Sequence, residues 1–202
     1  MLIEQLPWWL RIGRGMEWRR DEREKKIYLS FDDGPIPEVT PWVLDVLDRY
    51  GIKATFFCVG ENVHKHPEVY EEILRRGHRT GNHSYNHVQG LKMADRRYYD
   101  NIEQAARIIH SPLYRPPHGI VRPSQLRYLR KRYQLELSDV VPRDYSPRLS
   151  GQQVLDKACR YVRNGSIIVF HDSLKAEKNL RYALPPFIEY CLGQGWQFEL
   201  LY

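Results

Sequence analysis

The chain has 202 residues, of which 42% are hydrophobic and 12% aromatic, and it carries a formal net charge of +6. This length and ordinary composition indicate one globular domain and exclude a disordered, fibrous or membrane-embedded protein, because no stretch approaches the roughly 20 apolar residues of a membrane span. The positive charge is spread over helical stretches, which is typical of solvated helix faces, and no nucleic-acid-binding motif accompanies it.

The first 25 residues are rich in Trp and Arg and precede the first expected strand. Their apolar residues 6–10 are interrupted by Pro7 and followed by Arg11 and Arg14, too early for the apolar core of a signal peptide. We therefore expect residues 1–25 to pack as an N-terminal segment on a domain formed by residues 26–202. We also expect a cytoplasmic protein.

Short runs of β-branched and aromatic residues alternate with helical patterns from residue 26 to the C-terminus. This alternation is the sequence signal for parallel βα units. The sequence therefore predicts one α/β domain with about seven parallel strands. The candidate strands cover residues 27–31, 55–59, 79–82, 113–115, 135–140, 167–170 and 198–201.

Helices are expected between these strands. Residues 40–50 begin with Thr40 as the N-cap and a proline at the first helical position, place apolar residues on one face, and stop at Gly51. Residues 67–76, stopped by Gly77, show the same pattern. Further helices are expected around residues 102–109 and 155–162, and a last one ends before Gly193.

Two adjacent carboxylates, Asp32 and Asp33, follow the first expected strand, and Gly34 and Pro35 then force a turn. In parallel α/β folds the C-terminal strand ends form one face, so polar residues that follow different strands converge there. Because successive side chains of a strand alternate in direction, Asp32 and Asp33 can take different roles. Taken alone, the same four residues are also an ordinary polar turn.

His83 and His87 follow the third expected strand and are four residues apart. A helical turn there would put both imidazoles on one face, which is a common way to offer two nitrogen ligands to a metal. By themselves, two histidines are more often solvated or satisfied in the core. Asp33 adds a carboxylate, and two His with one Asp form a three-ligand site with positions left for water and substrate. We therefore expect one divalent ion, zinc, with cobalt or another divalent ion as alternatives, and Asp32 beside it as a base.

His171 ends an apolar strand and can act as a proton donor. Hydrolysis of an amide needs such a donor, because an amine anion leaves poorly near neutral pH. Arg115 is a cation suited to fixing a carboxylate, and Asp144 is an anion suited to keeping His171 protonated. Arg115 and Asp144 are also typical of structural ion pairs, and His171 of a histidine satisfied at a strand end.

Five motifs of the chain resemble, in the same order, those of the polysaccharide deacetylases of carbohydrate esterase family four, whose domain is called NodB-like. Residues 30–35 are similar to the first motif, residues 83–87 to the second and residues 115–119 to the third. Residues 144–145 fall where the fourth motif has Asp-Trp, and residues 169–171 where the fifth has Leu-x-His. Five motifs in order are highly specific, and the resemblance runs from about residue 26 to the C-terminus.

The resemblance implies a deformed (β/α) barrel with its site at the C-terminal strand ends. It implies that Asp33, His83 and His87 bind the metal. It also implies that Asp32 is the general base and His171 the general acid.

Flanking roles are implied as well: Arg115 would orient Asp32, and Asp144 would raise the proton affinity of His171. Substrate contacts are implied for three further positions, namely the main-chain N–H of His118 at the oxyanion and the side chains of Tyr145 and Val169 around the acetyl methyl group. Residues 26–202 would then be the catalytic domain.

The expected activity is removal of N-acetyl groups from a sugar or polysaccharide of chitooligosaccharide or peptidoglycan type, which makes a carbohydrate the expected partner. A carbohydrate O-acetyl esterase is an alternative, since the same groups cleave esters. An iron oxygenase with two His and one carboxylate shares the ligand set, but the sequence has no cupin-like His-x-Asp pairing. A non-catalytic sugar-binding relative is a third alternative, although such proteins usually lose ligands and here the whole set is present.

Overall fold

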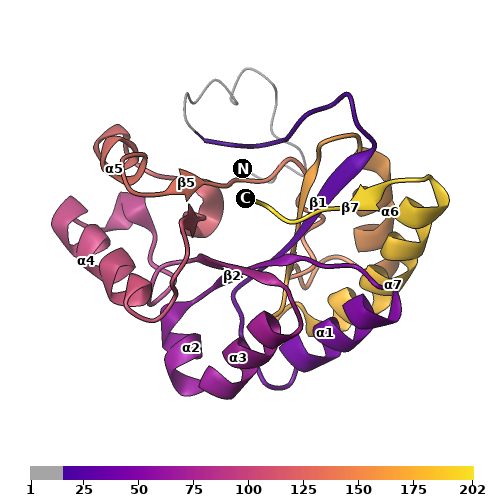
Figure 1. Cartoon of the computed structure of the whole chain (residues 1–202), viewed down its shortest axis with the longest axis horizontal. Helices are drawn as coiled ribbons and strands as arrows, with labels where there is room; N and C mark the ends of the chain where they lie inside the picture. The colour runs from indigo at the N-terminus through magenta and orange to yellow at the C-terminus, as the bar shows by residue number, and fades with distance from the viewer. Residues whose placement is uncertain (1–15) are drawn as a thin grey trace.

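The computed structural model describes residues 16–202. They form a curled sheet with helices on its outer side (Figure 1). The strands lie in the order β5, β4, β3, β2, β1, β6, and β7 pairs with the start of β1, always in parallel. The expected deformed (β/α) barrel with about seven parallel strands is therefore confirmed. The strands are β1 (Lys26–Asp32), β2 (Thr55–Cys58), β3 (Arg79–Asn82), β4 (Leu113–Tyr114), β5 (Gln134–Leu135), β6 (Ile167–His171) and β7 (Gln197–Phe198).

β1 lies between β2 and β6 in the sheet and is buried along residues 27–32. Its near-continuous apolar run is what a strand covered on both faces requires. In its register, Asp32 pairs with Phe57 of β2 on one side and with His171 of β6 on the other. The sheet therefore brings Asp32 and His171 side by side at its carboxyl edge.

The gap between β5 and β6 is bridged by a segment that precedes β1. The N–H of Glu17 donates to the carbonyl of Leu135 at 2.8 Å, and the N–H of Arg20 donates to the carbonyl of Gly165 at 2.8 Å. Of the strand expected over residues 135–140, only the first residue belongs to β5, and the prediction is otherwise wrong. Glu136 makes a single bridge to Glu17, and Val140 makes a single bridge to Ile168 of β6. The chain between them passes from one neighbouring segment to another and does not run along either as a strand.

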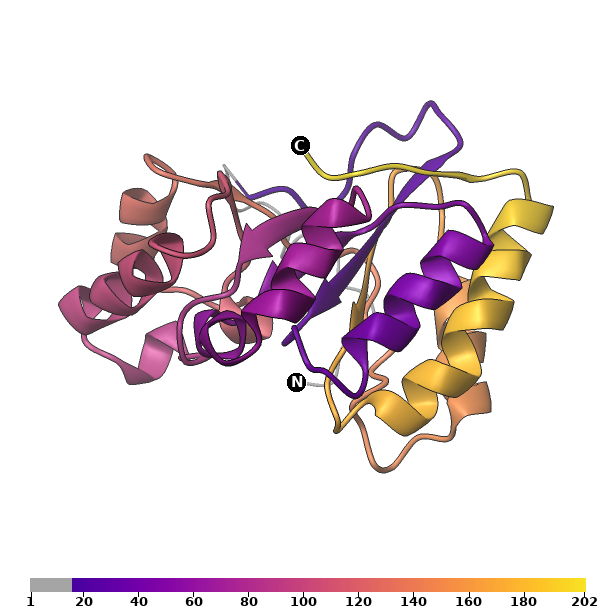
Figure 2. The same cartoon turned by 60° about the horizontal axis from the view of Figure 1, so that its bottom comes forward.

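Helices α1 (Thr40–Arg49), α3 (Pro67–Arg75) and α7 (Glu177–Gly193) contribute apolar residues to the main core together with β1. Figure 2 shows α1 and α7 side by side on the outer surface. The expected ends of α1 and α3 are confirmed, since Gly51 and Gly77 follow them with left-handed φ angles of 65° and 76°. The expected N-cap is wrong: Val39 is the N-cap, and Thr40 is the first residue of α1.

The short helix α2 (Gly60–Lys65) was not expected from the sequence, whereas the other short helix, α5 (Pro123–Leu129), overlaps a stretch around Arg127 that was expected to be helical. α2 buries only two of its six residues, so it carries little amphipathic pattern.

None of the helices within residues 16–202 combines the length and apolar composition needed to span a bilayer. The remaining helical elements are α4 (Asp95–Ala106), α6 (Gly151–Tyr161) and the 3-10 turns η2 (Gly90–Lys92) and η3 (Pro117–Gly119).

Candidate active site

Asp32 and Asp33 separate because the backbone turns at the end of β1. Asp32 is the last residue of β1, whereas Asp33 has a left-handed φ of 82°. This turn, not the alternation of an extended strand that we expected, gives the two carboxylates their different directions. The side-chain amide of Asn62 donates to the carbonyl of Asp33 at 2.7 Å, and the buried Asp172 accepts the N–H of Gly34 at 3.1 Å. Such contacts hold a backbone conformation that is costly for a residue other than glycine.

His83 and His87 come together in a loop, and the helical turn expected there is wrong. Ser84 and His87 have left-handed φ angles of 64° and 53°. The N–H of Ser84 donates to Oδ1 of Asn82 at 2.8 Å, and the N–H of Val88 donates to Oγ of Ser84 at 3.1 Å. Asn and Ser side chains that bond nearby backbone in this way compete with a helix. The two imidazoles nevertheless lie with their ring centroids 5.0 Å apart.

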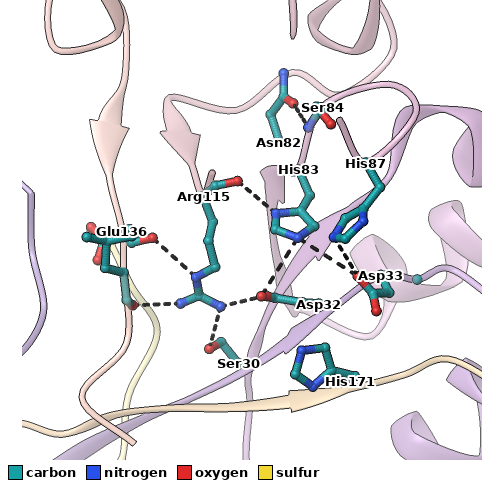
Figure 3. Close-up of polar contacts among 12 residues, drawn as sticks. Ser30, Asp32, Asp33, Asn82, His83, Ser84, His87, Arg115, Glu136 and His171 are labelled. Carbon is teal, nitrogen blue, oxygen red and sulfur yellow. Dashed lines mark hydrogen bonds and ion pairs between the residues drawn. The ribbon is translucent and has the colours of Figure 1, made fainter. Parts of the chain in front are cut away.

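Asp33, His83 and His87 bring three potential metal-ligand atoms together (Figure 3). One ligand atom from each residue lies within 4.8 Å of the other two. Nε2 of His87 is 3.2 Å from Oδ1 of Asp33, and Nε2 of His83 is 3.9 Å from the same oxygen. The three residues singled out by the sequence as metal ligands thus converge on one point.

The donor set fits a divalent cation. Oδ1 of Asp33 is buried without a hydrogen-bond partner among residues 16–202, a costly state for a carboxylate oxygen unless a cation takes it up. Nδ1 of His83 lies 2.7 Å from the carbonyl oxygen of Arg115, which can only accept, so Nδ1 carries the proton and Nε2 presents a lone pair. Burial lowers the pKa of His83 to about 4, which keeps the imidazole in its neutral, metal-binding form. Two nitrogens and one carboxylate oxygen suit zinc and leave coordination positions open.

The guanidinium of Arg115 fixes Asp32 inside the protein. Nη1 donates to Oδ1 of Asp32 at 2.6 Å and to Oγ of Ser30 at 2.9 Å. The other two nitrogens donate to the main-chain carbonyls of Glu136 and Leu137 at 3.2 and 3.1 Å. Because every nitrogen of the guanidinium has a partner, the position of the carboxylate of Asp32 is set by the surrounding fold.

Asp32 is an ionised carboxylate in this setting. Burial raises its pKa, but the positive charge of Arg115, together with His83 and His171, outweighs burial, and the pKa of Asp32 is lowered from its ordinary value. Oδ2 of Asp32 lies 3.9 Å from Nε2 of His83, on the side of the three ligand atoms. One oxygen is therefore held by Arg115, and the other faces the candidate metal site.

His171 is held twice by Asp144. The N–H of His171 donates to Oδ2 of Asp144 at 2.7 Å, and Nδ1 of the ring lies 2.8 Å from Oδ1. Because the carboxylate accepts, Nδ1 carries a proton and Nε2 is left for other partners. Burial lowers the pKa of His171, but the charge and hydrogen bond of Asp144, with smaller contributions from Asp33 and Asp32, raise it to about 9. His171 is thus an imidazolium near neutral pH.

The three residues singled out as substrate contacts flank this centre. The exposed ring of His118 lies 4.9 Å from that of His87, and its backbone is left-handed with a φ of 61°. The ring of Tyr145 packs edge-on against the ring of His171, with the two ring centroids 4.7 Å apart. Val169 is buried two residues before His171 in β6, hence on the same face of the strand. His118 therefore borders the ligand cluster, whereas Tyr145 and Val169 border the proton donor.

Asp172, Thr40 and Asn62 support the turn at Asp33, and none of them was predicted from the sequence to belong to the site. Asp172 accepts a hydrogen bond from the hydroxyl of Thr40 at 2.6 Å in addition to that from Gly34. Burial raises the pKa of Asp172 to about 8 despite these bonds. A carboxylate directly after an apolar strand was the available signal for Asp172, whereas nothing local distinguishes Asn62 from any polar loop residue.

Residues 19–137 match the family model described as polysaccharide deacetylase, which is more than half of the chain. The matched region contains the three candidate ligands, Asp32 and Arg115. It ends before Asp144 and His171; the sheet pairs His171 with Asp32, and Asp144 bonds to His171.

Two relatives and one solved structure resemble the chain along most of its length. A peptidoglycan-N-acetylglucosamine deacetylase of Bacillus cereus is 29% identical over 189 residues, covering 90% of this chain and 88% of the relative. A chitooligosaccharide deacetylase of Bradyrhizobium sp. (strain ANU 289) is 31% identical over 156 residues, covering 73% and 71%. The crystal structure of the Bc1960 peptidoglycan N-acetylglucosamine deacetylase, in complex with 4-naphthalen-1-yl-N-oxidanyl-benzamide, has a TM-score of 0.90 at 26% identity, covering 97% of this chain and 95% of that one.

Proposed function

Since this chain belongs to the polysaccharide deacetylase family, we propose that it is a metal-dependent hydrolase that removes N-acetyl groups from an N-acetylated sugar or polysaccharide. The observation that carries this proposal is the convergence of three ligand atoms from Asp33, His83 and His87 beside an ionised Asp32 and a protonated His171. The names of two relatives, a peptidoglycan-N-acetylglucosamine deacetylase and a chitooligosaccharide deacetylase, support the same class of substrate.

Asp33, His83 and His87 would hold the ion, and a zinc or similar divalent ion supplies Lewis-acid polarisation of the acetyl carbonyl and lowers the pKa of a water molecule. Asp32 then acts as the general base. Its Oδ2 faces the ligand cluster and is ionised, so it can accept the proton of the water that attacks the carbonyl carbon. Arg115 keeps the other oxygen of Asp32 in place.

His171, which lies beside Asp32 at the carboxyl edge of the sheet, is the general acid. The carbon–nitrogen bond breaks as Nε2 of His171 gives a proton to the departing nitrogen, and acetate and a free amine are the products. Asp144 favours the protonated ring and fixes its orientation, which leaves Nε2 as the proton-carrying atom toward the site. Asp144 therefore acts through His171 and not on substrate.

The remaining residues would shape the acetyl pocket. The main-chain N–H of His118 would donate to the oxygen of the tetrahedral centre, where a fixed donor is worth about 2.7–4 kcal/mol in enzymes of this kind of chemistry. Tyr145 and Val169 border His171 and would enclose the acetyl methyl group.

Acetate release from two substrates tests the proposal. Zinc-loaded protein should release acetate from chitooligosaccharides and much less from acetylated xylan. The reverse order would favour an O-acetyl esterase. Release from neither substrate at any zinc concentration would contradict a deacetylase function.

A further inference from the structure

Arg20 and Glu136 form a buried ion pair that has no role in the chemistry described above. Nη2 of Arg20 donates to Oε1 of Glu136 at 2.5 Å, and the side-chain amide of Gln134 donates to the same oxygen at 3.0 Å. The side chain of Glu136 is fully buried, and that of Arg20 is 15% exposed. The pair therefore ties the segment that precedes β1 to the residue that directly follows β5.

Stability does not account for this pair. Oε2 of Glu136 and Nε of Arg20 are both buried without a hydrogen-bond partner among residues 16–202. A buried polar atom that loses its water and gains no partner is destabilising. Replacement of a buried ion pair by apolar side chains is accordingly often neutral or stabilising. An explanation for the pair therefore has to come from the groups that it holds in place.

Glu136 lies beside Arg115, on the side away from Asp32 (Figure 3). The main-chain carbonyls of Glu136 and Leu137 accept hydrogen bonds from Nε and Nη2 of Arg115 at 3.2 and 3.1 Å. The carboxyl group of Glu136 also interacts with both arginines, since burial raises its pKa while the positive charges of Arg20 and Arg115 oppose the rise. Two of the three guanidinium nitrogens of Arg115 therefore depend on where residues 136 and 137 lie.

Glu136 and Leu137 follow β5 and lie outside the strands, so contacts other than a regular ladder fix their carbonyls. The N–H of Leu137 donates to the carbonyl of Glu17 at 2.7 Å, and the N–H of Glu17 donates to the carbonyl of Leu135 at 2.8 Å. Glu17 lies three residues before Arg20 in the same segment. This segment therefore holds residues 136 and 137 twice, through the backbone of Glu17 and through the side chain of Arg20.

We propose that Arg20 and Glu136 are positioning residues for the proposed general base. The pair fixes the carbonyls that hold Arg115, and Arg115 holds Asp32 at 2.6 Å. The inference rests on the proposed function, since it assigns the pair to the base of that reaction. Loss of the pair should lower kcat and leave KM and the Kd of zinc near their wild-type values, because the side-chain bonds of the pair, within residues 16–202, reach no candidate metal ligand.

The first experiment replaces both members of the pair, so that no unpaired charge stays buried. The Arg20→Met, Glu136→Gln double variant should lower kcat by about tenfold, which is less than the loss of about 10²-fold that a misplacement of about 1 Å can cause. Arg19→Met is the matched control, because Arg19 belongs to the same segment and pairs with the exposed Glu22. It should keep the wild-type kcat. The thermal unfolding midpoint of each variant identifies any that fails to fold.

A double-mutant cycle separates positioning through Arg115 from a general loss of structure. If the pair acts through Arg115, the double variant should change kcat by less than about twofold in an Arg115→Met background, because the guanidinium that it positions is already gone. A general structural effect would lower kcat by the same factor in both backgrounds. Should the double variant not fold, Arg20→Lys enters the same cycle, since it keeps the charge and loses the guanidinium geometry. Its smaller loss of kcat should again disappear in the Arg115→Met background.

Two outcomes would overturn the positioning role. One is a folded double variant with the wild-type kcat. The other is an equal loss of kcat with and without the side chain of Arg115. If the wild-type protein releases no acetate from any substrate, the proposed function fails instead, and a crystal structure of the folded variant decides the positioning role: an Arg115–Asp32 contact unchanged from 2.6 Å would overturn it.

Discussion

The main-chain carbonyl of Arg115 accepts a hydrogen bond from Nδ1 of His83 at 2.7 Å. The side chain of Arg115 meanwhile holds Asp32 at 2.6 Å. One residue therefore orients a candidate metal ligand through its backbone and the proposed base through its guanidinium. Because only the second contact depends on the side chain, substitution of Arg115 can separate the two functions.

Arg115→Met should lower kcat while zinc affinity stays near that of the wild-type chain, because the carbonyl contact to His83 survives. Loss of the guanidinium charge removes what lowers the pKa of Asp32, so the acidic limb of the kcat/KM profile should move to higher pH. Arg115→Met should also lower the free energy of unfolding by about 3–5 kcal/mol, because it removes one partner of a buried ion pair. The control is Arg122→Met, at the partly exposed pair with Asp95, which should lower it by about 0–1 kcal/mol. If Arg115→Met lost zinc affinity as completely as activity, the two functions of Arg115 would not be separable in this way.

Asp32→Asn and His171→Ala should each reduce turnover by about 10²–10⁴-fold, the usual contribution of a general base or acid. Both should still bind zinc, since neither residue supplies one of the three converging ligand atoms. Single-turnover acetate release and zinc content measured on the same preparations give the comparison. Wild-type turnover in either metal-loaded variant would remove that residue from the mechanism.

Asp144→Asn should move the basic limb of the pH–rate profile to lower pH. The working form of His171 is protonated, and its pKa is raised to about 9 mainly by Asp144 against the opposing effect of burial. Activity is therefore present below that pKa and lost as the pH rises through it. Without the charge of Asp144, burial dominates and the loss begins earlier. A bound cation shifts the basic limb to lower pH in both proteins, so the measured quantity is the difference in pH between the two basic limbs. Basic limbs at the same pH would contradict the role of Asp144.

Gly34→Ala should weaken zinc binding and destabilise the fold by about 1–3 kcal/mol. A Cβ on Gly34 would lie 2.0 Å from Oδ2 of Asp172, so the carboxylate or the turn carrying Asp33 must move. Gly193→Ala at the end of α7 is the control, because a Cβ there meets nothing within 4 Å, and it should leave both quantities unchanged or slightly improved. Zinc titration and chemical unfolding of the two variants would show whether Gly34 is needed; equal behaviour would mean that the turn tolerates a side chain.

The chemistry of the site was more accessible from the sequence than its geometry. Asp33, His83 and His87 stand out because metal-binding residue types follow expected strands. The predicted local geometry was wrong, because both the helical turn at His83 and His87 and the strand alternation at Asp32 and Asp33 were inferred from local sequence patterns alone. The actual turn at Asp33 depends on Asn62 and Asp172, which come from other parts of the chain.

The same limit applies to the fold. The buried strand β1 and the ends of α1 and α3 could be predicted, because buried apolar runs and terminal glycines are local signals. The segment at Glu17 that bridges β5 and β6 depends on hydrogen bonds to residues more than 100 positions away, and no local sequence pattern predicts it. Likewise, α2 is too short for its periodicity to be recognised.

A zinc titration of chelator-treated protein, with acetate release from chitooligosaccharide followed in parallel, tests the metal-dependent mechanism as a whole. We expect one ion bound per chain, activity that rises in proportion to occupancy, and loss of both in His87→Ala. A protein that binds no ion through Asp33, His83 and His87, or that releases acetate equally well after chelation, would contradict it.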